Sequence, residues 1–178
     1  LRHLIWHPLG SCLERWLHVA LMHRGGLAAA EPTSLWWWAS LAARLLAFEV
    51  LFDALFYVAH RVVHSHAALY AAVHKQHHVH KHDLCLTSAL QMTAADVGLT
   101  HTLPVLGALL LVPVAPGFEL SLVKAYLLFQ EIYGHAGCEH RGRNFGPAPW
   151  LVQAMGVELR SEDHQLHHIR AGVNFSKR

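Results

Sequence analysis

The chain of 178 residues is 53% hydrophobic and 15% charged, with a formal net charge of +2. So small a charge excludes the broad basic surface that nucleic-acid binding needs, and the composition is apolar for a soluble domain. Three scattered cysteines form no CxxC pair and exclude a disulfide framework, whereas histidine stands out with 18 residues. These values favour a single membrane-associated domain whose function uses imidazole.

The N-terminal segment, residues 1–34, mixes apolar and charged side chains. We expect it to form a peripheral or interfacial helix. Because the chain opens on Leu1 and stops abruptly at Arg178, we expect a fragment that begins inside a longer protein and is truncated at its C-terminus.

Residues 35–59 follow the helix-start residues of EPTS and are long enough to cross a bilayer. The run Trp36–Trp38 suits an aromatic anchor at the membrane interface. Arg44, Glu49 and Asp53 fall roughly on one side of a helix. Charges at membrane depth face protein or a polar cavity, so we expect this side to look inward. The alternative is a buried amphipathic helix of a soluble bundle.

Two further apolar stretches, 97–113 and 117–134, are separated by PVAPG, whose prolines and glycine predict a turn. A membrane hairpin of this kind returns the chain to its starting side and places 60–96 and 135–178 on one face. An excess of basic residues marks a cytoplasmic face, and this face carries Arg61, Lys75, Lys81, Arg141, Arg143, Arg160, Arg170, Lys177 and Arg178. The expected fold class is all-α, an integral membrane helical bundle with a cytosol-facing, histidine-rich metal-binding cap.

Three groups of histidines recur on that face, in HRVVH, HKQHH and HQLHH. Their spacings of three and four residues aim imidazoles from one face of a helix at a common point. One such pair arises often by chance, whereas three groups in one short chain predict a metal site. The predicted ligands are eight clustered histidines and a ninth just after the hairpin: His60, His64, His74, His77, His78, His164, His167, His168 and His135. Weaker candidates are His80, His82 and His140.

The number of imidazoles also predicts the number of ions. Eight to ten nitrogens exceed what one ion uses, so two ions with four or five histidines each fit best. Imidazole binds zinc, copper, iron and nickel alike, so the ligands alone do not name the metal. GxGxxG, P-loop, HExxH and GxSxG motifs are all absent from the sequence, which leaves nucleotide binding and zinc proteolysis without support.

Four runs, FDALFYVAHRVVH, LYAAVHKQHH, GHAG and HQLHHIRAGVNFSKR, resemble the fatty acid hydroxylase / sterol desaturase superfamily over residues 35–178. Asn174 resembles the N-[YF] that follows the last histidine group of that family. The D-x3-Y-x2-HR run that commonly opens its first histidine motif is matched by Asp53, Tyr57, His60 and Arg61.

This resemblance implies two non-haem iron ions bound by the nine histidines, with no catalytic residue beyond these ligands. It also implies O2 as oxidant, a lipid substrate (a sterol or fatty acyl chain) and electrons from NAD(P)H through a cytochrome b5-type or reductase partner. The expected location is the endoplasmic reticulum membrane of a eukaryote or the inner membrane of a bacterium. No nucleic-acid partner is expected.

One departure from the family pattern is QMTAADVGLT, where many members carry a His-Pro-x-Glu-like stretch. Either a histidine is lost there or its role passes to His82 or His101. The predicted function is therefore O2-dependent hydroxylation or desaturation of a lipid. Two alternatives stay open: a polytopic membrane protein that binds or transports metal, and a degenerate family member that keeps zinc as a scaffold.

Overall fold

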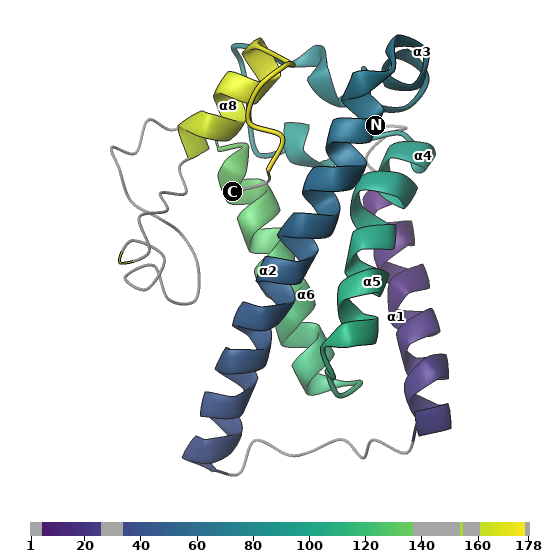
Figure 1. The fold of residues 1–178 in the computed structure, drawn as a ribbon, viewed down its shortest axis with the longest axis vertical. Coiled ribbons are helices and arrows are strands. Elements are labelled where there is room, and N and C mark those ends of the chain that lie inside the picture. The colour runs from purple at the N-terminus through teal and green to yellow at the C-terminus, as the bar shows by residue number, and fades with distance from the viewer. Residues whose placement is uncertain (1–4, 26–33, 137–153, 155–160, 177–178) are drawn as a thin grey trace.

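The computed structural model describes residues 5–25, 34–136, 154 and 161–176. This part of the chain contains helices and no strand, which confirms the all-α prediction. Four helical segments run along the long axis of the molecule and alternate in direction (Figure 1). They are α1 (Trp6–Gly25), α2 (Leu35–Ser65), the π-helix η4 (Val97–Thr102) continued by α5 (Leu103–Leu111), and α6 (Phe118–Gly134).

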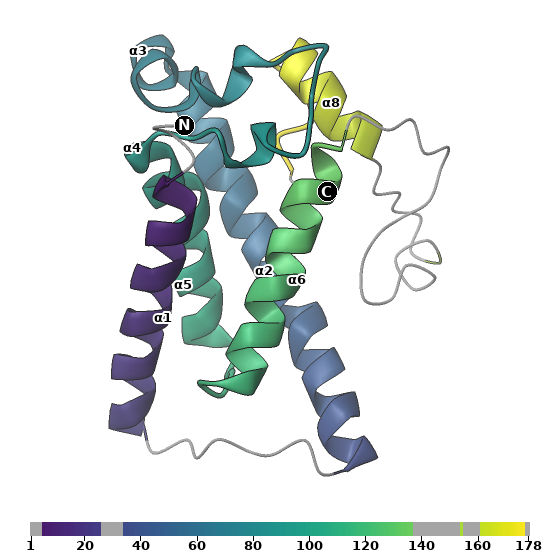
Figure 2. The same ribbon diagram turned by 180° about the vertical axis from the view of Figure 1, so that it is seen from behind.

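Shorter elements gather as a cap at one end of these four segments (Figures 1 and 2). The cap contains α3 (Ala67–Leu69), the π-helix η1 (Tyr70–His74), the 3₁₀ helices η2 (His77–Val79) and η3 (Ser88–Leu90), α4 (Ala94–Asp96) and α8 (Ser161–Ile169). The hairpin of α5 and α6 leaves the cap and returns to it. The described residues of 60–96 and 161–176 therefore meet at the same end of the bundle.

Helix α2 reaches from the far end of the bundle into the cap (Figure 1). It begins at Ser34, whose hydroxyl accepts a hydrogen bond from the Trp37 N–H at 3.2 Å, as expected of a serine N-cap. No proline or glycine interrupts it, and it ends where His66 turns to an extended conformation. The helix runs six residues past the stretch predicted to cross the bilayer, so His60 and His64 lie on its last turns.

A stripe of phenylalanines on α2 forms the centre of the core. Phe48, Phe52 and Phe56 are four residues apart and therefore share one face of the helix. Their rings follow one another at 6.2 and 6.1 Å and are almost fully buried. They pack in one cluster with residues of α5 and α6 that include Val105, Ala108, Leu109, Leu120, Val123 and Leu127. Burying each large side chain contributes about 1.5–3 kcal/mol, so this stripe fixes how α2 meets the hairpin.

An ion pair fixes the far end of the hairpin. The Arg44 guanidinium donates two hydrogen bonds to the Glu119 carboxylate, at 2.6 and 2.7 Å, and a third to the Pro113 carbonyl at 2.9 Å. Glu119 also accepts from the Ala115 N–H at 2.9 Å. Gly117, with φ of +94°, supplies the left-handed backbone that this turn needs. Arg44 thus faces the protein as predicted, and the turn lies where PVAPG predicts it.

Helix α1 packs along η4 and α5 (Figure 2). We expected this segment at the periphery, and the structure buries its Glu14 and His18 in the bundle. The His18 ring Nε2 donates to the Val114 carbonyl at 2.8 Å, and Glu14 forms an ion pair with Lys124 of α6. These contacts tie α1 to the turn of the hairpin and to α6.

Within the described residues, one helical stretch, Ala94–Leu111, is long and apolar enough to cross a membrane, and half of it is buried in the bundle. It overlaps the span predicted at 97–113. The spans at 35–59 and 117–134 stay predictions.

Candidate metal centre

The cap brings all nine predicted histidines together in two groups. Within each group, one ring nitrogen per histidine lies within 4.8 Å of that of every other member. Group one consists of His60 and His64 of α2, His74 of η1, His78 of η2 and His167 of α8. Group two consists of His77 of η2, His135 at the end of α6, and His164 and His168 of α8.

Each HxxHH motif contributes to both groups. In α8, His164 and His168 are four residues apart and serve group two, whereas His167 serves group one. Adjacent residues on an α-helix point about 100° apart, so His167 and His168 diverge toward different centres. The same division separates His77 from its neighbour His78. Two segments of chain therefore hold both groups in place.

Eight of the nine histidines are buried and His64 is partly buried, which keeps the rings uncharged. Burial, together with the neighbouring imidazoles, lowers the pKa of His64 to about 4 and the pKa of His168 to about 3. Burial and neighbouring rings also hold the pKa of His60, His77 and His164 well below the ordinary value of 6.5. At neutral pH these rings are uncharged, which is the form that binds a metal ion.

Backbone carbonyls determine which ring nitrogen carries the proton. Nδ1 lies 2.8 Å from the Phe175 oxygen in His60, 2.7 Å from the Val173 oxygen in His167, and 2.8 Å from the Glu131 oxygen in His135. A carbonyl oxygen only accepts hydrogen bonds, so Nδ1 of each neutral ring carries the proton. Each Nε2 then presents a lone pair to the centre of its group.

In group one, two of these lone pairs face each other. His74 Nδ1 lies 2.7 Å from the Asp96 carboxyl oxygen. With Asp96 ionised, this oxygen only accepts, so Nδ1 carries the proton and the Nε2 of His74 is an acceptor too. That Nε2 is 2.9 Å from His60 Nε2, and His64 Nε2 is 3.1 Å from the same atom. Two acceptors cannot hydrogen-bond to one another. Two nitrogens bound to one ion at about 2.1 Å stand about 3.0 Å apart at a right angle. The residues present therefore fit a metal ion.

Group two has the same spacing. His135 Nε2 lies 3.2 Å from His77 Nε2 and 2.9 Å from His164 Nε2. His168 Nε2 lies 3.2 Å from His164 Nε2. Four imidazoles around one point suit a second ion and, like group one, suit zinc, copper, iron or nickel.

The weaker candidates lie outside both groups. His80 contacts Asp83 and Gln91 at the edge of the cap, and His82 is exposed. His101 is buried below the cap and stacks on His7 with ring centroids 4.5 Å apart. Of these three, none replaces a ligand in the described groups. His140 lies outside the described residues.

Sequence reasoning missed Asp96, which lies within the departing stretch QMTAADVGLT. Thr93 caps α4 by accepting from the Asp96 N–H at 3.1 Å and donates to the Val73 carbonyl at 2.9 Å, which holds α4 against η1. Thr100 donates to the Asp96 carboxyl oxygen at 3.0 Å. Asp96 therefore orients His74, as a partner on the outer nitrogen of a metal ligand does. The sequence contains one indication of this role, because Asp96 is an ionisable residue within an apolar stretch.

Replacing Asp96 by alanine should weaken metal binding at group one about 10- to 100-fold, because His74 loses the partner that fixes its ring. Asp96→Asn should keep most of the affinity, since its amide oxygen accepts the same hydrogen bond. Metal titration of the purified chain measures both. Equal losses at the two groups in Asp96→Ala would show that the substitution acts through folding instead.

The turn after α8 supplies two of the carbonyl acceptors. Asn174 has φ of +52°, a left-handed conformation that asparagine adopts more readily than most residues. Its side-chain amide donates to the Asp163 carbonyl at 3.1 Å, which holds the turn against the start of α8. The carbonyls of Val173 and Phe175, on either side of Asn174, then reach one histidine each.

Fold and site together define an all-helical protein with two histidine groups that could each hold a metal ion. Residues 45–178 match the family described as Fatty acid hydroxylase, and the chain belongs to this family. The chain is 29% identical over 150 residues to "Fatty acid hydroxylase vlmA" of Lecanicillium sp.. That match covers 81% of this chain and 41% of the relative, so the chain spans less than half of the relative's length. No solved structure matches the chain.

Proposed function

We propose that the protein is a membrane-bound, non-haem di-iron oxidoreductase that uses O2 to hydroxylate or desaturate a lipid, a sterol or fatty acyl chain. The nine histidines of the two groups would hold the two irons. Membership of the fatty acid hydroxylase family supports the oxidoreductase class and a lipid substrate.

The observation that carries the proposal is the pair of facing lone pairs on His60 and His74, 2.9 Å apart. Both outer nitrogens are already occupied, by the Phe175 carbonyl and by Asp96. A cation between the two inner nitrogens turns this repulsion into coordination. A protein that bound no metal here would be more stable if these two nitrogens formed hydrogen bonds instead of facing each other.

The exposed surface supports a membrane location. Large apolar side chains on the outer faces of the bundle include Val50, Val58, Leu103, Leu110, Leu111 and Phe129. Trp36 is 82% exposed near the start of α2, at the end of the bundle opposite the cap, where an aromatic anchor would meet the interface. The cap exposes Arg61, Lys75, Lys81 and Arg170, a basic bias that favours the cytosolic side.

Breaking an unactivated C–H bond is beyond ordinary side chains, and two bound iron ions would supply the redox chemistry that O2 activation needs. Hydroxylation converts R–H, O2, two electrons and two protons into R–OH and water. Desaturation uses the same inputs, removes two hydrogens from neighbouring carbons and yields two waters. NAD(P)H would supply the electrons through a cytochrome b5-type or reductase partner.

The residues of the chain have three tasks in this reaction. The buried histidines keep their inner nitrogens unprotonated, and the carbonyls and Asp96 hold the rings in fixed orientations. The bundle below the cap excludes water and presents apolar walls to a lipid chain. The position of one substrate carbon relative to the site then decides between hydroxylation and desaturation.

The test is metal analysis of the detergent-purified, full-length protein, followed by turnover with ¹⁸O2, NAD(P)H and a reductase. We expect two irons per chain and a lipid product that either carries one ¹⁸O atom or has a new double bond. One metal or none per chain would overturn the dinuclear site. Metal uptake by proteoliposomes without turnover would favour transport, and two zincs without turnover after iron reconstitution would favour a degenerate scaffold.

A further inference from the structure

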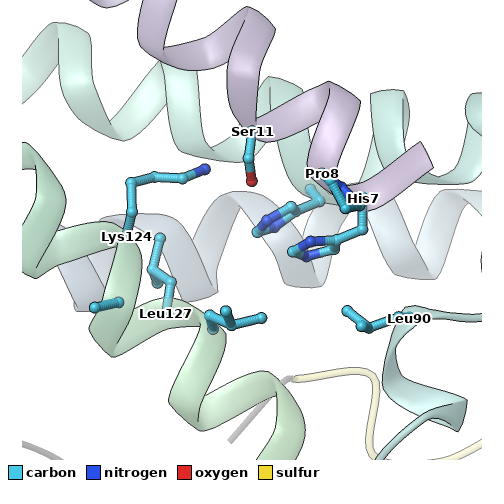
Figure 3. A pocket seen from close by; sticks show the side chains of 9 residues that line it. His7, Pro8, Ser11, Leu90, Lys124 and Leu127 are labelled. Atoms are coloured by element: carbon cyan, nitrogen blue, oxygen red, sulfur yellow. The ribbon is translucent and has the colours of Figure 1, made fainter. Parts of the chain in front are cut away.

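A cavity of about 390 Å³ lies between α1, η4 and α6, just below the cap (Figure 3). Such a volume is at the lower end of the range for small-molecule sites. Its walls are mainly aliphatic, and His7, Ser11 and Lys124 reach it from α1 and α6. Leu90 of η3 closes the side nearest the cap.

The cavity lies close to both histidine groups along the chain. Leu128, which lines it, precedes His135 by seven residues, or about 10 Å along α6 at 1.5 Å per residue. His101, on another wall, follows Asp96 by five residues, and Asp96 hydrogen-bonds to His74. The cavity is therefore lined by the same elements that lead to both histidine groups.

The charges in the wall select what the cavity accepts. Lys124 is the one lysine, arginine or acid among the described lining residues, and its ammonium is already paired with Glu14. The Glu14 side chain is 1% exposed, so the charge of Lys124 is neutralised by a buried carboxylate of the protein itself. A carboxylate entering the cavity would find the lysine already neutralised by Glu14, and burying an unpaired charge is strongly unfavourable.

An uncharged polar group meets a different environment. The Ser11 hydroxyl both donates and accepts, so an alcohol reaching it gains a hydrogen bond without bringing in a charge. At about 30 Å³ for each group the size of a water molecule, the cavity holds on the order of a dozen carbons.

We propose that this cavity binds the substrate, and that the substrate is a long-chain lipid with an uncharged hydroxyl end rather than a free fatty acid. This inference rests on the proposed oxidoreductase function and specifies the substrate class of that site. The ion pair between Glu14 and Lys124 acts as the selectivity element, because it neutralises the lysine that would otherwise attract a carboxylate.

Photolabelling of the purified full-length protein tests the assignment. Two probes, hexadecan-1-ol and hexadecanoic acid with the same mid-chain diazirine, differ only in their end group. We expect the alcohol to label peptides of α1 and α6 that line the cavity, and to do so at least about tenfold more than the acid. Equal labelling by the acid, or labelling confined to other helices, would overturn the proposal.

Glu14→Gln provides a gain-of-function test. The substitution keeps the shape of the side chain and leaves the Lys124 charge available to a ligand. Labelling by the acid should rise about tenfold or more, as expected for a new charge-assisted hydrogen bond, with little change for the alcohol. Glu49→Gln is the matched control, since it also replaces a buried glutamate of the bundle but lies away from the cavity. A similar rise in Glu49→Gln would contradict the assigned role of Glu14.

Measuring the iron content of the same samples distinguishes failure of this proposal from failure of the proposed function. Alcohol-selective labelling in a chain that binds no iron even after reconstitution would support the cavity assignment and overturn the di-iron oxidoreductase. Two irons per chain without labelling of the cavity would do the reverse.

Discussion

Replacing His60 by alanine should reduce the metal content from two ions per chain to one and abolish lipid oxidation. His60 belongs to group one only, and its Nε2 lies 2.9 and 3.1 Å from two other ring nitrogens of that group. Group two keeps all four of its histidines. Elemental analysis at saturating metal, together with the turnover assay, measures both effects.

Two matched variants complete this experiment. His135→Ala should remove the other ion and leave group one loaded, because His135 belongs to group two. His82→Ala should keep both ions, since this histidine of the cap is exposed and outside both groups. A full metal complement in His60→Ala would show that group one is not a metal site.

Acidification should destabilise the metal-free protein well before it affects most proteins of this size. Burial lowers the pKa of His64 to about 4 and that of His168 to about 3, from an ordinary value of 6.5. At a pH between these lowered pKa values and 6.5, the histidines are protonated in the unfolded chain but not in the folded chain. The contribution of these histidines to the free energy of unfolding is therefore largest above pH 6.5 and falls as the pH decreases toward 3 to 4.

The size of this effect follows from the number of rings. Each fully buried histidine contributes on the order of 1 kcal/mol per pH unit in this window. Thermal unfolding of the metal-free chain in detergent, followed by circular dichroism between pH 7.5 and 5, should show a steep fall in Tm. Bound metal should shift this fall to lower pH, because metal and protons compete for the same nitrogens.

Two variants test whether the buried histidines cause this pH dependence. His66→Ala, at an exposed histidine beside the cap, should leave the pH dependence unchanged. His168→Phe should flatten it, since a buried group that titrates is replaced by one that does not. A Tm that stays constant from pH 7.5 to 5 would contradict the burial of neutral imidazoles.

Local periodicity explains why the nine histidines could be predicted. Their spacing places them on helical faces, and the hairpin parity brings the three groups to one end of the bundle. The division of each HxxHH motif between two centres also follows from helix geometry, because adjacent residues such as His77 and His78 diverge. The sequence alone did not assign them, since the relative positions of η2 and α8 depend on packing.

Partners far apart in the chain could not be predicted in this way. Asp96 reaches His74 across 22 residues, and Phe175 reaches His60 across 115. The second contact uses a backbone carbonyl, which leaves no trace in residue type. Helix α1 is a similar case: its mixed composition predicted a peripheral or interfacial helix, and it gave no sign that His18 meets a partner 96 residues away.

Two short segments, residues 74–78 and α8, each carry ligands for both groups. An ion bound in one group restricts the motion of these segments at a cost in conformational entropy. The second ion meets rings that are already ordered and binds more tightly for that reason. Such positive cooperativity makes half-loaded molecules scarce when metal is limiting. When the metal is scarce, a population of chains would then be a mixture of empty and fully loaded molecules. Activity would rise sharply over a narrow range of metal concentration rather than in proportion to it.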